Sequence, residues 1–310
     1  PMAAGDGRPV YSEPVATLAP DPYGAGARVL LLEKQTLLPG AVVRGVALAP
    51  DGSIFLADTL NHRIWHVRPD GTVASFGGYG AEPGQLNEPW DVAVDAEGAI
   101  YVADTWNHRI QKFSPDYTPM GSWGGLVQVA MTGLPTAQGL FYGPRALTIS
   151  PDGELYVSDT GNKRVQVFDL DGAFLREFGG SGARAGALDE PVGIAVNGNG
   201  VVAVADTWNR RIQLFTPQGE ALTQWTVPTW DVTNPDEKPF LAWGDNDDRL
   251  YVTDPMRRRV LAFDAQGGYQ WALTAAGGTS LGFPQGLKAV DGTLYIGDAH
   301  AGALYAVELP

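Results

Sequence analysis

The 310-residue chain contains no cysteine, which excludes disulfide bonds and thiolate metal sites. It has only four histidines, so a zinc site built from three imidazoles has few residues to draw on. Basic residues are also scarce, because 21 Lys and Arg stand against 35 Asp and Glu, for a net charge of −14. Phosphate contacts dominate nucleic-acid affinity, so this acidic balance argues against a nucleic-acid partner.

Long apolar runs and catalytic signatures are missing as well. No stretch is apolar for long enough to span a bilayer, so we expect no direct membrane insertion, although attachment of a parent chain to a membrane stays open. No intact signal peptide is present, and no run with helical period interrupts the sequence. Neither a Gly-x-Ser-x-Gly motif nor a phosphate-binding loop occurs, so no familiar catalytic motif points to an enzyme.

The sequence does contain a repeat. The segment Tyr101–Phe113 (YVADTWNHRIQKF) has five related copies, which are Ile54–Val67, Leu155–Phe168, Val202–Phe215, Leu250–Phe263 and Leu294–Val307. An aspartate at the same place in each copy recurs at intervals of 44 to 55 residues. Repetition at this period is typical of solenoids and propellers.

Each unit holds four short apolar runs separated by turn signals. In the second unit these runs are Val92–Asp95, Ala99–Ala103, Arg109–Phe113 and Thr118–Trp123. Runs of this length, rich in Val, Ile, Tyr and Phe and joined by Asp-Gly and similar pairs, predict antiparallel strands in a meander. We therefore predict an all-β fold, a six-bladed β-propeller of four-stranded antiparallel blades.

The two ends of the chain depart from the repeat. Residues 1–27 are rich in proline and glycine and are interpreted as a leader or linker, and residues 28–310 as the propeller. The run Arg28–Glu33 has no partner nearby in sequence, and the last unit stops after its third strand. We therefore expect this N-terminal strand to close the sixth blade, which leaves no unpaired edge.

Five units pair the repeated aspartate with an arginine five residues later. Because the acid ends one strand and the arginine begins the next, the two side chains should meet across a short connection. A catalytic pair would not occur five times at equivalent places, so these residues are interpreted as structural turn pairs. The pairs are Asp58 with Arg63, Asp104 with Arg109, Asp159 with Arg164, Asp206 with Arg211, and Asp254 with Arg259.

A ligand site should lie where the repeats differ. One face of a propeller carries the connections that lead into the first strands and those that join second to third strands. These positions are rich in aromatic residues and arginine, which are the residues that dominate binding interfaces. The opposing interpretation is that the tryptophans pack on neighbouring loops. The predicted ligand-binding residues are Arg44, Trp90, Trp106, Arg145, Trp208, Phe240 and His300.

The unit resembles the NHL repeat, here of a bacterial type. The residues that carry the resemblance are the Asp-Thr-x-Asn-x-Arg segments, the Phe-Gly-Gly or Trp-Gly-Gly after the fourth strand, and the Glu-Pro pairs that begin at Glu88 and Glu190. The resemblance implies a propeller and, by analogy with bacterial NHL proteins attached to exported partners, an extracytoplasmic location. Some NHL propellers are zinc lyases, but His62, His66, His108 and His300 do not fall at the expected channel positions.

Taken together, these features favour a non-catalytic recognition or scaffold propeller that binds a protein, peptide or glycan on its aromatic-rich face. No cofactor is predicted, but calcium stays open, because Asp91, Asp231 and the 245–248 cluster offer oxygen ligands. The alternative is a metal-dependent (calcium or zinc) hydrolase, lactonase or lyase with its site at the central channel. A second alternative is a structural subunit of a larger extracellular assembly.

Overall fold

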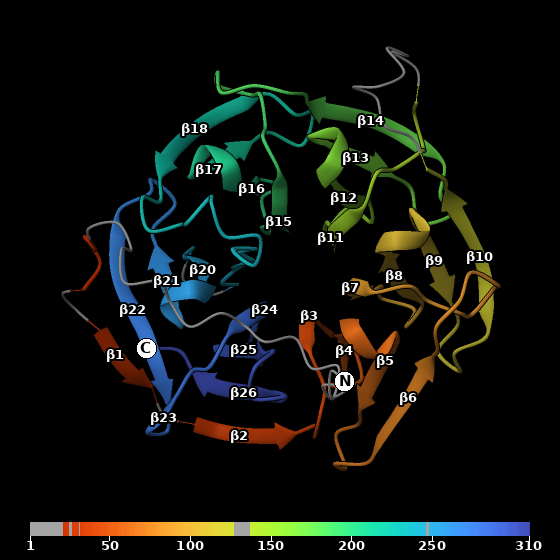
Figure 1. Cartoon of the computed structure of the whole chain (residues 1–310), viewed down its shortest axis with the longest axis horizontal. Coiled ribbons are helices and arrows are strands. Elements are labelled where there is room, and N and C mark those ends of the chain that lie inside the picture. Colours follow the sequence, from red (N-terminus) through yellow and green to blue (C-terminus); the bar gives the residue numbers. More distant parts are fainter. Residues whose placement is uncertain (1–20, 25–26, 31, 127–136, 246–247) are drawn as a thin grey trace, which may run out of the picture.

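The computed structural model describes residues 21–24, 27–30, 32–126, 137–245 and 248–310. In this part of the chain, six β-sheets are arranged radially in a ring, as the sequence predicts (Figure 1). Sheets that pack between two neighbours need strands that are apolar on both faces. The second strands meet this need, since every residue of β4, β8, β12, β16 and β20 is buried.

Blades 1 to 4 each contain four consecutive antiparallel strands, with the first strand at the channel. Blade 1 consists of β3 (Val43–Leu48), β4 (Ile54–Asp58), β5 (Arg63–Val67) and β6 (Val73–Gly77). Blade 2 consists of β7 (Pro89–Val94), β8 (Ile100–Asp104), β9 (Arg109–Phe113) and β10 (Pro119–Gly124). Blade 3 consists of β11 (Pro144–Ile149), β12 (Leu155–Asp159), β13 (Arg164–Phe168) and β14 (Phe174–Gly179). Blade 4 consists of β15 (Pro191–Val196), β16 (Val202–Asp206), β17 (Arg211–Phe215) and β18 (Ala221–Thr226).

The last two blades take strands from both ends of the chain. Blade 5 contains β19 (Leu241–Trp243), β20 (Leu250–Asp254), β21 (Arg259–Phe263) and β22 (Tyr269–Ala276), together with β23 (Thr279–Ser280) and the parallel strand β1 (Ala27–Leu30). Blade 6 contains β24 (Pro284–Val290), β25 (Thr293–Asp298), β26 (Ala303–Glu308) and the N-terminal β2 (Leu32–Leu37). The ring is therefore closed by the N-terminal strand, as predicted.

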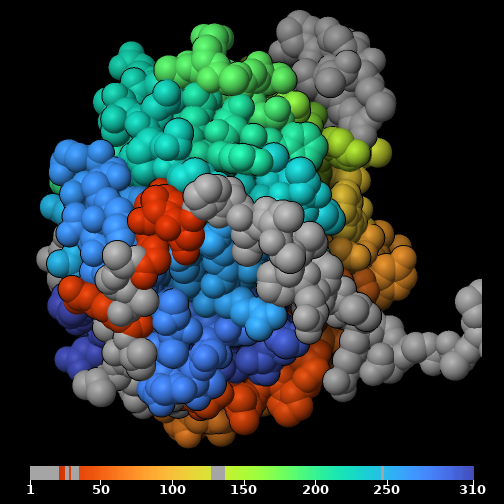
Figure 2. Space-filling view, turned by 60° about the vertical axis from the view of Figure 1, so that its left-hand side comes forward, coloured from red at the N-terminus to blue at the C-terminus, as the bar shows by residue number. Residues whose placement is uncertain are grey.

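The closing strand lies a few residues later in the sequence than expected. The predicted strand Arg28–Glu33 is divided, because β1 pairs with β22 of blade 5 whereas β2 pairs with β26 of blade 6. Asp21 and Tyr23, within the predicted leader, also contact blade 5. The Asp21 carboxylate accepts two hydrogen bonds from Arg259, at 2.8 and 2.9 Å. Figure 2 shows this N-terminal segment, in red, against the blue strands of the last two blades.

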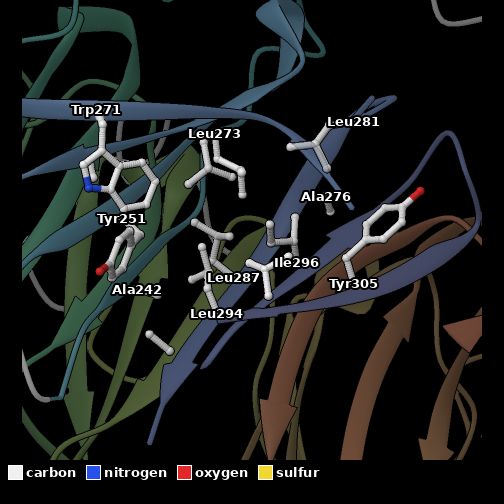
Figure 3. Close-up of a cluster of buried hydrophobic side chains, with 14 of the residues drawn as sticks. Ala242, Tyr251, Trp271, Leu273, Ala276, Leu281, Leu287, Leu294, Ile296 and Tyr305 are labelled. Atoms are coloured by element: carbon white, nitrogen blue, oxygen red, sulfur yellow. The ribbon is translucent and has the colours of Figure 1, made fainter. Parts of the chain in front are cut away.

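The hydrophobic core lies between blades. Six clusters of buried side chains each join two neighbouring blades around the ring. In the cluster between blades 5 and 6, Tyr251 and Trp271 face Leu287, Ile296 and Tyr305 (Figure 3). Removal of any blade would expose two such surfaces, so the closed ring is the unit of stability. No helix in the described residues is long and apolar enough to cross a membrane.

Candidate functional site

A single 3₁₀ turn joins the second and third strands in each of the first five blades. These turns are η1 (Thr59–Asn61), η2 (Thr105–Asn107), η3 (Thr160–Asn162), η4 (Thr207–Asn209) and η5 (Pro255–Arg257). The aspartate before each turn is fully buried and pairs with the arginine that follows, at N–O distances of 2.6 to 2.9 Å. In the sixth blade, Ala303 replaces the arginine, and Asp298 accepts backbone N–H groups instead.

The turn aspartates also position the loops that lead into the first strands. Asp206 Oδ1 accepts the backbone N–H of Asp189 at 2.6 Å, and Asp104 Oδ1 accepts that of Asn87 at 2.7 Å. The next residue in each loop is a glutamate with positive φ, 49° at Glu88 and 52° at Glu190. Non-glycine residues rarely adopt this conformation, and it tends to occur at functional sites. The same hydrogen bond therefore places two strained glutamates on one face of the ring.

The two glutamates have different partners. Glu88 Oε2 accepts the indole N–H of Trp106 at 2.9 Å. Glu190 Oε1 instead accepts from Arg145 Nη1 at 2.6 Å and from Lys238 Nζ at 2.5 Å. Both cations bind the same oxygen, and no described residue bonds the other oxygen, Oε2. Glu190 thus has one oxygen held by two positive charges and one oxygen available to a ligand.

The electrostatic environment keeps Glu190 ionised. Burial alone would raise the pKa of its carboxyl, but Arg145 and Lys238 outweigh this effect and lower the pKa. Burial and the nearby Arg145 lower the pKa of Lys238, whose side chain is only 4% exposed, while Glu190 raises it. The three groups form a compact ion cluster with a net positive charge.

Arg145 also contacts an aromatic residue at the mouth of the channel. Its guanidinium lies 4.5 Å from the centroid of the Trp90 ring, and the Arg44 guanidinium of the preceding blade lies 3.9 Å from the same ring. Such cation–π contacts orient a guanidinium plane at low entropic cost. Trp90 therefore fixes the position of Arg145, whose N–H groups other than those on Nη1 are not bonded to any described residue.

The ion cluster borders a cavity of about 250 Å³ on the same face. Its walls include the exposed indoles of Trp106 and Trp208, from η2 and η4. Lys163 and Asp189, also in the lining, pair at 2.8 Å. The remaining lining residues are Tyr142, Gly143, Arg145, Thr160, Gly161 and Glu190.

The predicted ligand-binding residues divide into three groups. Trp106, Arg145 and Trp208 line the cavity. Arg44, Trp90 and Phe240 are buried around the channel mouth and do not line the cavity. His300 is exposed in blade 6 and does not line the cavity.

Sequence reasoning missed Glu190 and Lys238. The Glu-Pro pair was visible as a repeat feature, but the residues that distinguish Glu190 from Glu88 lie 45 and 48 positions away, at Arg145 and Lys238. The connection that leads into blade 3, Leu126–Gly143, lies partly outside the described residues.

The central channel encloses a smaller volume than the cavity, and its lining residues are mostly aliphatic. It encloses about 100 Å³ and contains two charged residues, Asp91 and Lys288. Both Asp91 oxygens accept backbone N–H groups, from Val92 at 2.9 Å and Leu147 at 3.0 Å, and burial raises its pKa to about 8. Desolvation between the channel walls also lowers the pKa of Lys288, although part of its side chain is exposed to solvent. Asp91 therefore joins blades 2 and 3, and we place the candidate site in the larger cavity.

At the channel, the described residues provide few side chains that are typical metal ligands. The described residues contain no cluster of three or more His, Asp or Glu side chains that is able to hold a metal ion. The six positions at the channel mouth are Arg44, Trp90, Arg145, Val192, Phe240 and Gln285. None of them is a carboxylate or an imidazole, and two are arginines. Part of the predicted 245–248 oxygen cluster lies outside the described residues.

Comparison with protein families identifies the family of this chain. Residues 82–253, more than half of the chain, match the family described as the SMP-30/Gluconolactonase/LRE-like region. The chain belongs to this family. An NHL-repeat relative, the RING finger protein nhl-1 of Caenorhabditis elegans, is 47% identical over 51 residues, which are 16% of this chain and 5% of that protein. The NHL resemblance is thus supported over about the length of one repeat, but the bacterial NHL type is not established.

Solved structures agree with the six-bladed fold. A gluconolactonase from Xanthomonas campestris is 18% identical, with a TM-score of 0.63, and the match covers 96% of this chain and 99% of that one. A catalytically inactive histidine-to-alanine variant of virginiamycin B lyase from Staphylococcus aureus, with quinupristin, is 16% identical, with a TM-score of 0.61 and coverage of 88% and 82%. At these identities the likeness shows the fold alone.

The expectation of a non-catalytic recognition or scaffold module is overturned by family membership. The description of the family names gluconolactonase, which is an enzyme. Both a gluconolactonase and a lyase have the same fold. The prediction failed for a physical reason. It relied on contiguous catalytic motifs and histidine ligands, whereas a propeller assembles its polar groups from separate blades, as Glu190, Arg145 and Lys238 show.

Proposed function

We propose that this member of the SMP-30/gluconolactonase/LRE-like family is a lactonase, which opens a cyclic ester in the cavity between blades 2 and 4. The observation that carries the proposal is the state of Glu190. One carboxylate oxygen is held by Arg145 and Lys238, and the other is bonded to no described residue at the wall of a 250 Å³ cavity. An ionised, oriented carboxylate beside unused guanidinium donors is a suitable arrangement for acyl transfer to water.

Glu190 acts as the general base. Its free Oε2 accepts a proton from a water molecule as the water oxygen forms a bond to the lactone carbonyl carbon. The lowered pKa of Glu190 keeps the carboxylate ionised at neutral pH and well below it. Because Oε1 is fixed by two cations, the carboxylate does not rotate away from the cavity, which reduces the entropic cost of reaching the reactive geometry.

Arg145 stabilises the oxyanion that forms on the carbonyl oxygen. The guanidinium is held against Trp90, and its side chain is only 15% exposed, so its remaining N–H groups are oriented donors in a site with little water. Collapse of the tetrahedral intermediate breaks the ring C–O bond, and the alkoxide takes the proton from Glu190. The product is a hydroxy acid that carries the added water.

The fold family implies a metal, but these residues do not fit one. A divalent cation needs several oxygen or imidazole ligands, whereas the candidate site presents Arg145, Lys163 and Lys238 against only two carboxylates. Both carboxylates already bind these cations. We therefore derive each step from the side chains of the chain itself.

The lyase relative suggests a second reaction for the same groups. Glu190 is equally placed to remove a proton from the carbon next to the one that bears the ester oxygen. The alkyl C–O bond then breaks, the carboxylate leaves, and a double bond forms between those two carbons. Elimination gives an isomer of the cyclic ester, whereas hydrolysis adds one water. The mass of the product therefore separates the two reactions.

The test is turnover of a panel of five- and six-membered lactones and cyclic depsipeptides, with products measured by mass spectrometry. We expect the wild-type protein to add one water to at least one lactone. Glu190→Gln preserves the size and hydrogen bonding of the side chain but removes the base, and it should lower kcat by about a hundredfold to ten-thousandfold. Glu97→Gln, in an exposed hairpin of blade 2 away from the cavity, is the matched control and should retain full activity.

Two outcomes contradict the proposal. The first is that no lactone or depsipeptide of the panel is consumed by the wild-type protein. The second is that Glu190→Gln turns over substrate as fast as Glu97→Gln. An isomeric product with no added water, lost in Glu190→Gln, replaces the lactonase reaction with the elimination and retains Glu190 as the base.

A further inference from the structure

Two tryptophans on the cavity face are exposed to solvent, and the fold does not require a tryptophan at either position. Trp106 and Trp208 occupy the middle position of η2 and η4 and are 41% and 49% exposed, whereas the other seven tryptophans are buried or partly buried. The same turn forms with Leu60 in blade 1, Gly161 in blade 3 and Met256 in blade 5. The turn geometry therefore does not explain the two indoles, and burial does not either.

The blade between the two tryptophans has Gly161 at the same position, and Tyr142 packs directly against it. A Cβ atom on Gly161 would lie 2.2 Å from Cδ1 and 2.6 Å from the carbonyl oxygen of Tyr142, so this turn admits only glycine. The cavity extends from Trp106 past Gly161 to Trp208. Its volume of about 250 Å³ exceeds the roughly 150 Å³ that is enough to bind benzene in an engineered protein cavity.

Both indoles have polar neighbours. Trp106 Nε1 donates to Glu88 Oε2 at 2.9 Å, and its ring meets His108 edge-on at a centroid distance of 6.2 Å. The Lys163 ammonium lies 6.0 Å from the Trp208 ring centroid and is tied to Asp189. Rigid aromatic walls bind flat ligands with a low entropic cost, because few rotatable bonds are frozen on binding.

We propose that the cyclic ester taken by this site carries a planar aromatic ring, which binds between Trp106 and Trp208 while its ester group lies at Glu190 and Arg145. The position of the ester group rests on the proposed lactonase function, whereas the position of the aromatic ring does not. The two indoles and the ion cluster line one cavity, so a ligand that fills it contacts both.

The experiment uses two pairs of probes that differ only by a benzene ring. Isochromanone is a six-membered lactone fused to benzene, and δ-valerolactone is the same lactone without it. Their lactam counterparts, dihydroisoquinolinone and piperidinone, resist hydrolysis and report binding alone. Calorimetry measures lactam affinity, and initial rates measure kcat/KM for the lactones, in the full chain and its variants.

The variants use residues that the turn already tolerates. Trp106→Leu introduces the residue of blade 1, and Trp208→Met introduces that of blade 5, so both proteins should fold and melt like wild type. We expect the wild-type protein to bind dihydroisoquinolinone at least about tenfold more tightly than piperidinone. Each variant should bind dihydroisoquinolinone about tenfold more weakly than wild type does. Its affinity for piperidinone should be unchanged. Tyr79→Ala removes an exposed aromatic residue outside the cavity and should change neither affinity.

The binding measurement tests the aromatic-ring site, and the turnover measurement tests the lactonase function. Preference for the aromatic lactam without turnover of either lactone retains the ring site and refutes the lactonase. Turnover of both lactones with equal lactam affinities, or with affinities unchanged in Trp106→Leu and Trp208→Met, refutes the ring site and retains the lactonase.

Discussion

Removal of the Asp104 carboxylate tests whether the turn pairs hold the blades together. Asp104 is fully buried and accepts hydrogen bonds from Asn87 N at 2.7 Å, Asn107 Nδ2 at 2.9 Å, Arg109 Nε at 2.7 Å and Gln111 Nε2 at 3.0 Å. Asp104→Ala deletes all four acceptor contacts and leaves the guanidinium without its anion. The change therefore combines the loss of hydrogen bonds with an uncompensated charge.

The remaining hydrogen bonds of these donors determine how much the free energy of unfolding falls in Asp104→Ala. Arg109 keeps two backbone acceptors through Nη2, and Asn107 and Gln111 each keep one, so only the Asn87 N–H loses its sole acceptor. Breaking a buried ion pair costs about 3–5 kcal/mol, and these remaining contacts favour the lower end, about 3 kcal/mol. For 310 residues the unfolding entropy is about 0.65 kcal/mol/K, so Tm should fall by about 5 °C.

The assay is urea unfolding and calorimetry of Asp104→Ala, Arg109→Met and the double variant. The cycle should give a coupling energy above about 0.5 kcal/mol, because the two groups are in direct contact. A loss below about 1 kcal/mol for Asp104→Ala, or additive single variants, would refute a structural role for the pair. Loss of lactone turnover at unchanged stability would assign Asp104 to the site instead.

Two further predictions follow from the site and the ring closure. Lys238→Met removes one of the two cations that lower the pKa of Glu190, so the acidic limb of a kcat/KM profile against pH should move to higher pH. An unchanged limb would exclude Glu190 as the titrating base. In the wild-type protein, the lowered pKa of Glu190 stabilises the fold above the ordinary glutamate pKa, and this contribution is lost as the pH falls through the lowered value. Deletion of residues 1–37 removes β2 and opens blade 6, so it should lower Tm far more than deletion of 1–31, which spares that strand. Equal melting temperatures would contradict closure by β2.

Sequence reasoning succeeded where contacts are local. Blades 1 to 4 are meanders whose strands pair with their neighbours in sequence, so the six copies of the Asp-centred segment were enough to predict the blade number and most of the strand pairing. The polar bonds inside each turn are equally local. For example, Asp159 and Arg164 are five residues apart and meet across one 3₁₀ turn at 2.8 Å.

The propeller, its six repeats and the residues that form its turns were therefore predictable from the repeated segment. Tertiary structure decided which side chains form the site. Repeat positions alone do not say that Trp90 is buried while Trp106 is exposed, or that Glu190 binds two cations while Glu88 binds an indole. These differences depend on the packing of neighbouring blades, which brings residues more than 40 positions apart to within hydrogen-bond distance. A pattern with a period of one blade carries no information about such contacts.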